Sequence, residues 1–358
     1  MIKMEPRQES SPWMPYVSPL LAGVLTLITG AILFAALGQD PLFALKTVLI
    51  TPISDAYGVG ELFVKAGPIL LCALGLSVAY RANVWNIGAE GQLLMGGLAG
   101  SALAVQFTDS EGLWLLPAVL LFGIVAGMLW AALAALLKTK FNTNEILTTI
   151  MLNYIAFNLL QYCVHGPLKD PHGFNFPESA MFADAARLPL LMEDARVHMG
   201  IILALVSAVA VWVLLGKSFL GYQIQVLGRD SRAAKMAGFK EKRLVWLVLL
   251  LSGGLAGLAG VGEVAGPIGQ LVPQISPGYG YAAIIVAFLG RLHPVGVTLA
   301  SILMALLFMG GEMVQIELNL PLALVGMFQG MLLFYLLACD VLILYRIRWV
   351  SKPAVQTV

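Results

Sequence analysis

The sequence predicts an all-α membrane protein that crosses the bilayer about ten times. Two observations carry this fold class: hydrophobic residues make up 59% of the 358 residues and charged residues only 11%, and the mean hydropathy is +0.87. Soluble domains carry about 25% charged residues, so this composition is typical of a chain embedded in lipid. The formal net charge of +1 gives no reason to expect a nucleic-acid partner.

Apolar stretches of about 20 residues are taken as membrane-spanning helices. They lie at 18–38, 62–80, 87–107, 113–137, 145–165, 198–216, 244–262, 272–290, 294–311 and 321–343. The eighth is interrupted by Pro273 and Pro277 and preceded by Pro267, and a helix interior tolerates proline poorly. An even number of spans places both termini on the same side.

Basic residues gather on one side of these spans. The loop 217–243 has seven basic residues against two acidic ones, whereas the loop 166–197 has three against five. By the positive-inside rule, the first loop and both termini are predicted to be cytoplasmic, and the second loop lies outside. The expected organisation is a cytoplasmic tail at 1–17, a transmembrane permease domain at 18–345 and a second cytoplasmic tail at 346–358.

The outer connection 166–197 is long and interrupted by four prolines, Pro167, Pro171, Pro177 and Pro189. Loops of this length usually carry function or lack structure. Two interpretations stay open here: a docking surface for a partner, or a plain solvated linker.

One stretch, residues 81–100, is unusually polar and rich in glycine for a membrane span. A charge at the bilayer centre costs about 2.5–3.5 kcal/mol, so Glu90 is expected to face protein or a water-filled path. Glycines remove side chains where helices approach closely, and here they are Gly88, Gly91, Gly96, Gly97 and Gly100. The alternative is that the glycines only pack helices and that Glu90 only caps a helix.

The second half of the chain weakly echoes the first. The triplet Gly269-Gln270-Leu271 repeats Gly91-Gln92-Leu93, and each lies in an interrupted apolar segment with one glutamate, Glu263 or Glu90. Paired broken segments in two pseudo-repeated halves indicate a transport path at the repeat interface. Chance similarity in glycine-rich sequence is the alternative.

Catalysis is not expected of this chain. Its four histidines and three cysteines show no metal-ligand spacing and no nucleophile with a base; they are His165, His172, His198, His293, Cys72, Cys163 and Cys339. We therefore expect no bound cofactor or metal, and any ATP must be hydrolysed by another subunit.

A short helix is predicted inside the cytoplasmic loop. Asp230 can cap a first turn beginning at Ser231, and Gly238 supplies the left-handed residue that ends a helix. Small apolar residues lie on one face and basic residues on the other. Such a helix suits a groove on a cytoplasmic partner, and the alternative is contact with anionic membrane lipid.

Three motifs resemble the permease subunits of ABC importers of the branched-chain amino acid and monosaccharide permease superfamily, most closely the nucleoside (guanosine-type) uptake permeases. They are Asn83–Gln92, Thr143–Tyr154 and Gly228–Gly238, and the similarity covers roughly residues 18–345. The resemblance implies a multi-pass inner-membrane protein with three partners: a second permease in a heterodimer, a cytoplasmic ATPase and an extracytoplasmic substrate-binding protein.

The same resemblance implies an ATPase-coupling segment, although Arg232 stands where related loops carry glutamate. Its residues are Gly228, Arg229, Asp230, Arg232, Ala233, Ala234, Ala237 and Gly238. The predicted substrate path comprises Asn86, Glu90, Gln92, Asn144, Asn153, Glu263 and Gln270. Glu145 is not placed in this path, because it begins its helix and is expected to interact with the positive N-terminal end of the helix dipole.

The function expected from these features is ATP-driven import of nucleosides. The alternatives are the same machine carrying a monosaccharide such as ribose, and an ion-coupled secondary carrier. Proton-coupled carriers use relays of intramembrane ionisable residues, which this sequence does not offer.

Overall fold

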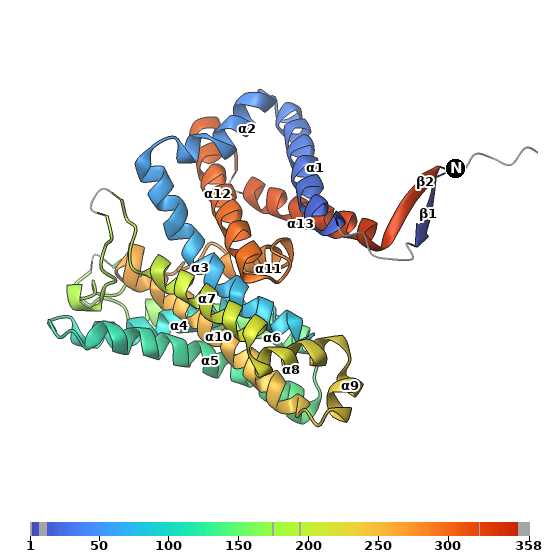
Figure 1. The fold of residues 1–358 in the computed structure, drawn as a ribbon. Coiled ribbons are helices and arrows are strands. Elements are labelled where there is room, and N and C mark those ends of the chain that lie inside the picture. Colours follow the sequence, from blue (N-terminus) through green and yellow to red (C-terminus); the bar gives the residue numbers. More distant parts are fainter. Residues whose placement is uncertain (1, 7–12, 174, 193–194, 322, 350–358) are drawn as a thin grey trace, which may run out of the picture. The chain divides into compact units, whose positions relative to one another are not determined.

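The computed structural model describes residues 2–6, 13–173, 175–192, 195–321 and 323–349. Residues 1, 7–12 and 350–358 of the predicted tails, and residues 174 and 193–194 of the predicted outer loop, lie outside the described residues. The elements are β1 (Ile2–Pro6), α1 (Met14–Ala36), α2 (Pro41–Leu49), η1 (Thr51–Ile53), α3 (Ala56–Arg81), α4 (Ala89–Ala104), η2 (Val105–Phe107), α5 (Leu115–Phe141), α6 (Glu145–His165), η3 (Asp184–Ala186), α7 (Gly200–Lys217), α8 (Phe219–Arg229), α9 (Ser231–Met236), α10 (Glu241–Glu263), η4 (Val264–Ile268), α11 (Tyr279–Leu289), α12 (Pro294–Leu318), α13 (Ala323–Leu344) and β2 (Tyr345–Trp349) (Figure 1).

The predicted all-α membrane class is confirmed. Among the described residues, 8 helices are long and apolar enough to cross a bilayer, namely α1, α3, α5, α6, α7, α10, α12 and α13. The two other predicted spans, 87–107 and 272–290, contain shorter helices, α4 with 16 residues and α11 with 11 residues. Helix α2 was not predicted as a separate element.

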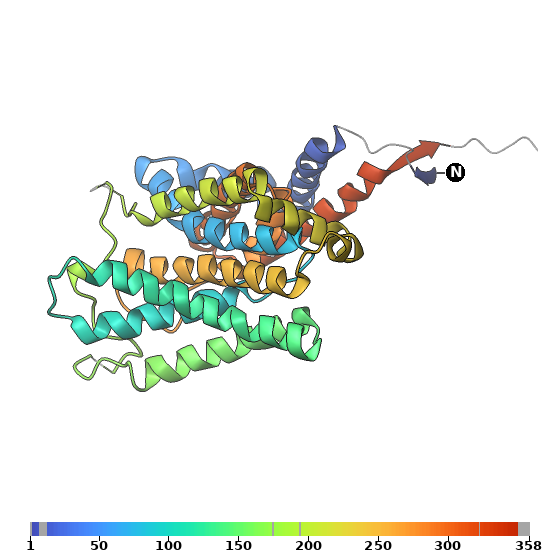
Figure 2. The same cartoon turned by 60° about the horizontal axis from the view of Figure 1, so that its bottom comes forward.

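The chain divides into two compact units, one formed by residues 53–306 and the other by residues 1–52 and 307–358. In the first unit, α10 packs against α3, α4 and α5, and α3 also packs against α7 and α11. Figure 2 shows the helices of this unit side by side in the order α7, α3, α10, α5 and α6. Helix α4 is the most enclosed of the short ones, because α5, α6 and α10 all contact it.

Close helix contacts in the first unit depend on glycine. A side chain at Gly260 of α10 would put its Cβ in collision with the carbonyl oxygen of Leu93 in α4. A Cβ at Gly127 of α5 would likewise collide with the carbonyl oxygen of Gly253 in α10. Without side chains at these positions the two backbones come into direct van der Waals contact, as is common between membrane helices.

Two segments of the first unit interrupt the helical pattern. Residues 82–88 separate α3 from α4, and residues 269–278 separate η4, a short π-helix, from α11. In the second segment, Gly269 has φ +76° and Gly278 has φ +103°, which is backbone that favours glycine. Proline at positions 267, 273 and 277 explains why the predicted eighth span is not one continuous helix.

The second unit contains α1, α2 and α13, with the C-terminal part of α12. Helix α1 packs against α2 and α13, and the hydroxyl of Ser18 donates to Asp340 Oδ1 at 2.6 Å. The Thr47 hydroxyl donates to Glu317 Oε2 at 3.0 Å. The strands β1 and β2 pair antiparallel, with residue 2 opposite residue 349.

Candidate functional site

A cavity of about 810 Å³ lies in the first unit, against α4, α6 and the start of α11. Its wall is mixed in character. It holds a carboxylate, several amides and aromatic rings: Glu90, Asn153, Asn158, Gln161, Gln274, Tyr154, Phe157 and Tyr281. Ligand sites for small molecules commonly measure about 300–1,000 Å³ and combine apolar walls with a few polar groups, so this cavity has the size and chemistry of one.

Glu90 lies at the inner wall of this cavity and is 6% exposed. Its Oε2 accepts a hydrogen bond of 2.7 Å from the backbone N–H of Gly280, in the first turn of α11. A helix N-terminus carries a partial positive charge, so the carboxylate is stabilised there without a basic side chain. Gly280 permits the contact, because a Cβ at this position would collide with the backbone of Glu90.

Asn153 of α6 joins three parts of the cavity wall. Its Oδ1 accepts from the backbone N–H of Gly91 at 2.9 Å, which satisfies an amide in the first turn of α4. Its Nδ2 donates to the carbonyl of Ile87 at 2.9 Å and to the hydroxyl of Tyr281 at 3.2 Å. Asn153 therefore positions the start of α4 and the start of α11 beside each other.

Two further predicted path residues, Asn86 and Gln92, are not among the residues that line the cavity. Asn86 Nδ2 donates to Gln92 Oε1 at 3.0 Å and to Ser252 Oγ of α10 at 2.9 Å, and Asn86 Oδ1 accepts from the Gly88 N–H at 2.9 Å. Asn86 is 0% and Gln92 1% exposed. We call Asn86, Gln92 and Ser252 the closed network; it ties residues 82–88 to α10.

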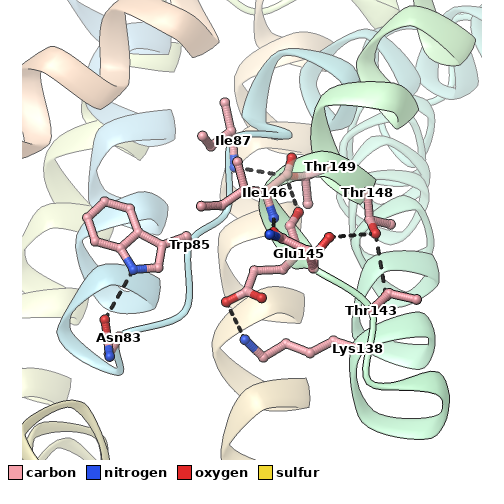
Figure 3. A network of polar contacts seen from close by, with 10 residues as sticks. Asn83, Trp85, Ile87, Lys138, Thr143, Glu145, Ile146, Thr148 and Thr149 are labelled. Carbon is pink, nitrogen blue, oxygen red and sulfur yellow. Dashed lines mark hydrogen bonds and ion pairs between the residues drawn. The ribbon is translucent and has the colours of Figure 1, made fainter.

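The start of α6 lies beside the same loop (Figure 3). Asn144 caps the helix by accepting from the Ile146 N–H at 2.9 Å, and Glu145 forms an ion pair with Lys138. The Thr149 hydroxyl accepts from the Ile87 N–H at 3.1 Å. Asn144 does not line the cavity, and its role in a substrate path stays a prediction.

The remaining predicted path residues lie apart from the cavity. Glu263 lines a separate enclosed space of about 20 Å³ that His198 also borders. Gln270 Nε2 donates to Glu178 Oε2 of the outer loop at 2.9 Å. Gln92 lies within α4, whereas Gln270 follows the left-handed Gly269, so the repeated triplet does not adopt one local conformation.

The loop 166–197, predicted to lie outside, is attached to the broken segment by backbone hydrogen bonds. The N–H groups of Ser179, Phe182 and Leu188 donate to the carbonyls of Leu271, Gly269 and Ala265 at 3.0, 3.0 and 2.8 Å. We call residues 179–188 the outer strap. It holds the chain that leads directly into the cavity wall at positions 273–278.

A bidentate ion pair fastens the end of the same loop to α3. Arg196 Nε and Nη2 donate to the two carboxylate oxygens of Glu61 at 2.8 and 2.6 Å. These hydrogen bonds raise the pKa of Arg196 above its usual value. A fork of this geometry is among the stronger polar contacts available to a surface loop.

The predicted coupling segment forms a helical corner. Asp230 caps α9 by accepting from the Arg232 N–H at 2.8 Å, and Gly238 has φ +78°, as predicted. Ala234 is buried, whereas Ala233 and Ala237 are exposed together with Met236, which is 89% exposed. The role of these residues in ATPase coupling stays a prediction.

Several cavity residues were missed by the sequence analysis. Tyr154, Asn158 and Gln161 recur at spacings of four and three, so they share one face of α6. Amides on one face of an apolar span were the available signal. Tyr281 gave no comparable signal, because the apolar helix α11 contains no amide or charged side chain.

A multi-pass helical bundle with a polar cavity beside broken helices defines the class of membrane permeases. The sequence matches the family "Branched-chain amino acid transport system / permease component" over residues 58–337. The chain belongs to this family, and it is a multi-pass protein of the inner (plasma) membrane.

The names of three similar proteins give different substrates. The glucose ABC transporter permease protein TsgB13 of Haloferax volcanii is 36% identical over 97% of this chain and 93% of the relative. The guanosine ABC transporter permease protein NupP of Bacillus subtilis is 31% identical over 93% of this chain and 94% of the relative. The nucleoside permease protein NupB of Lactococcus lactis is 30% identical over 82% of both chains.

A solved structure shares the fold. It is described as an ABC transporter in an inward-facing conformation, with a TM-score of 0.50 and 19% identity over 92% of this chain and 99% of that one. This similarity shows the fold alone. The family and the relatives named as ABC permeases favour the ATP-driven class over an ion-coupled carrier.

Proposed function

We propose that this chain is the permease subunit of an ATP-driven importer that carries nucleosides across the inner membrane. The observation that carries the proposal is the cavity, whose wall places the Glu90 carboxylate and the Asn153 amide beside the rings of Tyr154, Phe157 and Tyr281. A nucleoside offers ribose hydroxyls and a base edge for the polar groups and a flat ring for the aromatic ones.

The depth of the cavity fits import. Its residues on α6 run from Asn153, near the middle of the helix, to Gln161, one turn before the end at His165. That end lies on the predicted outer side, so the cavity extends from mid-membrane toward the side from which a binding protein would deliver cargo. The start of α11, a helix that begins inside the membrane segment, lies at the inner end of the cavity, as in many transporters.

We propose that a second permease covers the open side of the cavity. Tyr154, Phe157 and Asn158 are exposed on α6, and Tyr154 is 61% exposed. The Asn158 amide donates to the carbonyl of Tyr154 at 2.7 Å, but its Oδ1 and its second N–H would find no partner among lipid tails, which is unfavourable. A polar face on a membrane helix therefore supports a protein partner, and the two permeases together would enclose the path.

A second candidate cargo is a monosaccharide. It is favoured by one observation, the 36% identity to a glucose permease. A sugar would use the same carboxylate and amides through its hydroxyls, but it has no π-face to stack on the cavity rings.

Uptake in cells separates these cargoes. Cells with the complete transporter, with and without this chain, are given labelled guanosine, adenosine, cytidine, ribose or glucose. We expect loss of nucleoside uptake alone when the chain is absent. Loss of ribose or glucose uptake alone would transfer the assignment to sugars and leave the cavity as the path.

The ATPase that drives transport is proposed to be a separate subunit docked at residues 228–238. Gly238→Val should weaken docking, because a branched side chain strains a residue at φ +78°. Gly216→Val is the matched control, since its position is equally open but has no positive φ. Normal transport-stimulated ATPase activity in Gly238→Val, with the control also normal, would contradict the docking site.

A further inference from the structure

A groove of about 430 Å³ lies between α5 and α10 and shares no lining residue with the cavity. It is lined on one side by Met128 of α5 and on the other by a single stripe of α10: Lys242, Arg243, Trp246, Leu247, Leu250 and Leu251. These positions recur at spacings of three and four residues, which keep side chains on one helical face.

The stripe changes in polarity along its length. It begins with two cations, continues with an indole and ends with aliphatic side chains. Positions 242 and 251 are nine residues apart, which is about 13 Å of helix. This is close to the depth of one leaflet, since the hydrocarbon core of a bilayer is about 30 Å thick. The order of side chains thus matches the order of headgroup, interface and acyl chain in a single leaflet.

The two cations at the charged end of the groove are exposed. In the part of the chain that the structure describes, neither Lys242 nor Arg243 forms an ion pair, whereas Lys235 pairs with Glu241 at 3.0 Å. This end belongs to the predicted cytoplasmic loop 217–243. The cytoplasmic leaflet is the one that carries negative surface potential from anionic lipids.

The indole between the charged and aliphatic parts is fixed in place. Trp246 Nε1 donates to the Thr139 hydroxyl of α5 at 2.9 Å, so the ring is anchored across the two helices that form the groove. Tryptophan with a satisfied N–H and an apolar ring is typical of the membrane–water interface. Trp246 therefore marks the depth at which headgroup and acyl chain meet.

We propose that this groove binds one anionic phospholipid of the cytoplasmic leaflet. Its phosphate lies between Lys242 and Arg243, and one acyl chain lies along Leu247, Leu250 and Leu251. A soluble anion such as inorganic phosphate would use only the two cations and leave the apolar part of the groove empty. A zwitterionic lipid would fill the apolar part but gain less from the cations.

The test measures lipid retention on the full-length chain purified from membranes in mild detergent. Native mass spectrometry compares phosphatidylglycerol with phosphatidylcholine of the same acyl chains. We expect wild-type protein to bind phosphatidylglycerol about tenfold more tightly, and the variant Lys242→Gln/Arg243→Gln to lose that preference. The matched control Lys217→Gln/Lys240→Gln removes two cytoplasmic charges that lie outside the groove, and it should keep the preference.

A second variant tests the apolar part. Leu250→Trp fills the groove but leaves both cations in place, and we expect it to reduce phosphatidylglycerol binding while the protein elutes as folded material. Equal binding of the two lipids by wild type overturns the proposal. It is also overturned if millimolar inorganic phosphate displaces the lipid, or if the lipid is absent from the assembled transporter because a protein subunit covers the groove.

Discussion

Glu90 and Gln92 stand two residues apart in α4 but lie in two different environments. Successive residues of a helix turn by about 100°, so these two side chains leave α4 on nearly opposite sides. Glu90 faces the open cavity and meets the start of α11, whereas Gln92 joins the closed network with Asn86 and Ser252. Polar residues of one motif therefore lie in two settings: Glu90 borders the cavity for which we propose cargo contact, and Gln92 attaches the loop to α10.

The difference between the two environments is access to water. In the closed network each lost partner leaves a buried polar group without a hydrogen bond, which costs about 1–3 kcal/mol. At the cavity, water replaces a lost partner. Mutations in the closed network should therefore change the free energy of unfolding, and mutations at the cavity should change transport.

The largest effect is expected for a substitution that disrupts both environments together. Gly260→Val places a branched side chain against the Leu93 carbonyl, which already lies where a Cβ would stand. Helix α4 then cannot pack on α10, and both the closed network and the cavity wall lose their support. We expect no monodisperse folded protein by size-exclusion chromatography. Wild-type elution together with wild-type uptake would show that the two helices separate without consequence.

Asn86→Ala should affect the closed network alone. It removes the donor to Gln92 and Ser252 and the acceptor for the Gly88 N–H. The expected loss is about 2–4 kcal/mol in the free energy of unfolding. Thermal unfolding in detergent gives the stability, and uptake normalised to folded protein should stay near wild type. A stable variant with abolished uptake would instead place Asn86 in the cargo path.

Glu90→Ala should reduce transport and leave the stability of the fold nearly unchanged. A hydrogen bond to a charged group contributes about 1.5–3 kcal/mol, so uptake per folded transporter should fall about tenfold or more. The melting temperature should change little, because water in the cavity can reach the freed N–H of Gly280. Glu145→Ala serves as the comparison, since Glu145 pairs with Lys138 away from the cavity. Near-normal uptake in both variants would return Glu90 to a structural role.

Tyr281→Phe is the mildest change at the cavity. It deletes the hydroxyl that accepts from Asn153 at 3.2 Å and keeps the ring. We expect the apparent KM for the cargo to rise about threefold with the maximal rate unchanged, as a neutral hydrogen bond is worth about 0.5–1.5 kcal/mol. A fall in the maximal rate alone would indicate that this contact acts in the conformational change.

Much of the fold follows from the sequence, because apolar length and proline position set where helices run. Eight of the ten spans, the cap at Asp230 and the left-handed Gly238 were predicted from local patterns and are found in the structure. Helix α2 was not predicted, because the sequence analysis placed the first span at 18–38 and assigned no helix to the residues that follow it. Its start is nonetheless marked by Asp40, which caps it by accepting from the Leu42 N–H at 2.8 Å.

Only a small part of the cavity wall could be predicted, because the direction in which a side chain points depends on how its helix packs. Glu90 and Asn153 line it, but Asn144 caps its own helix and Glu263 lies beside another space. Each is a polar residue in or beside an apolar span, and sequence spacing does not say which neighbouring element its side chain meets. The ring of Tyr281 lies in the cavity wall because the start of α11 packs against the start of α4.

The outer strap has a practical consequence for protein engineering. A proline-rich outer loop is the usual choice for an epitope tag or a fluorescent insertion. Here an insertion between Ser179 and Leu188 would shift the N–H groups that bind the carbonyls of Gly269 and Leu271. Reporter fusions of this permease should therefore leave that stretch intact and carry their labels elsewhere.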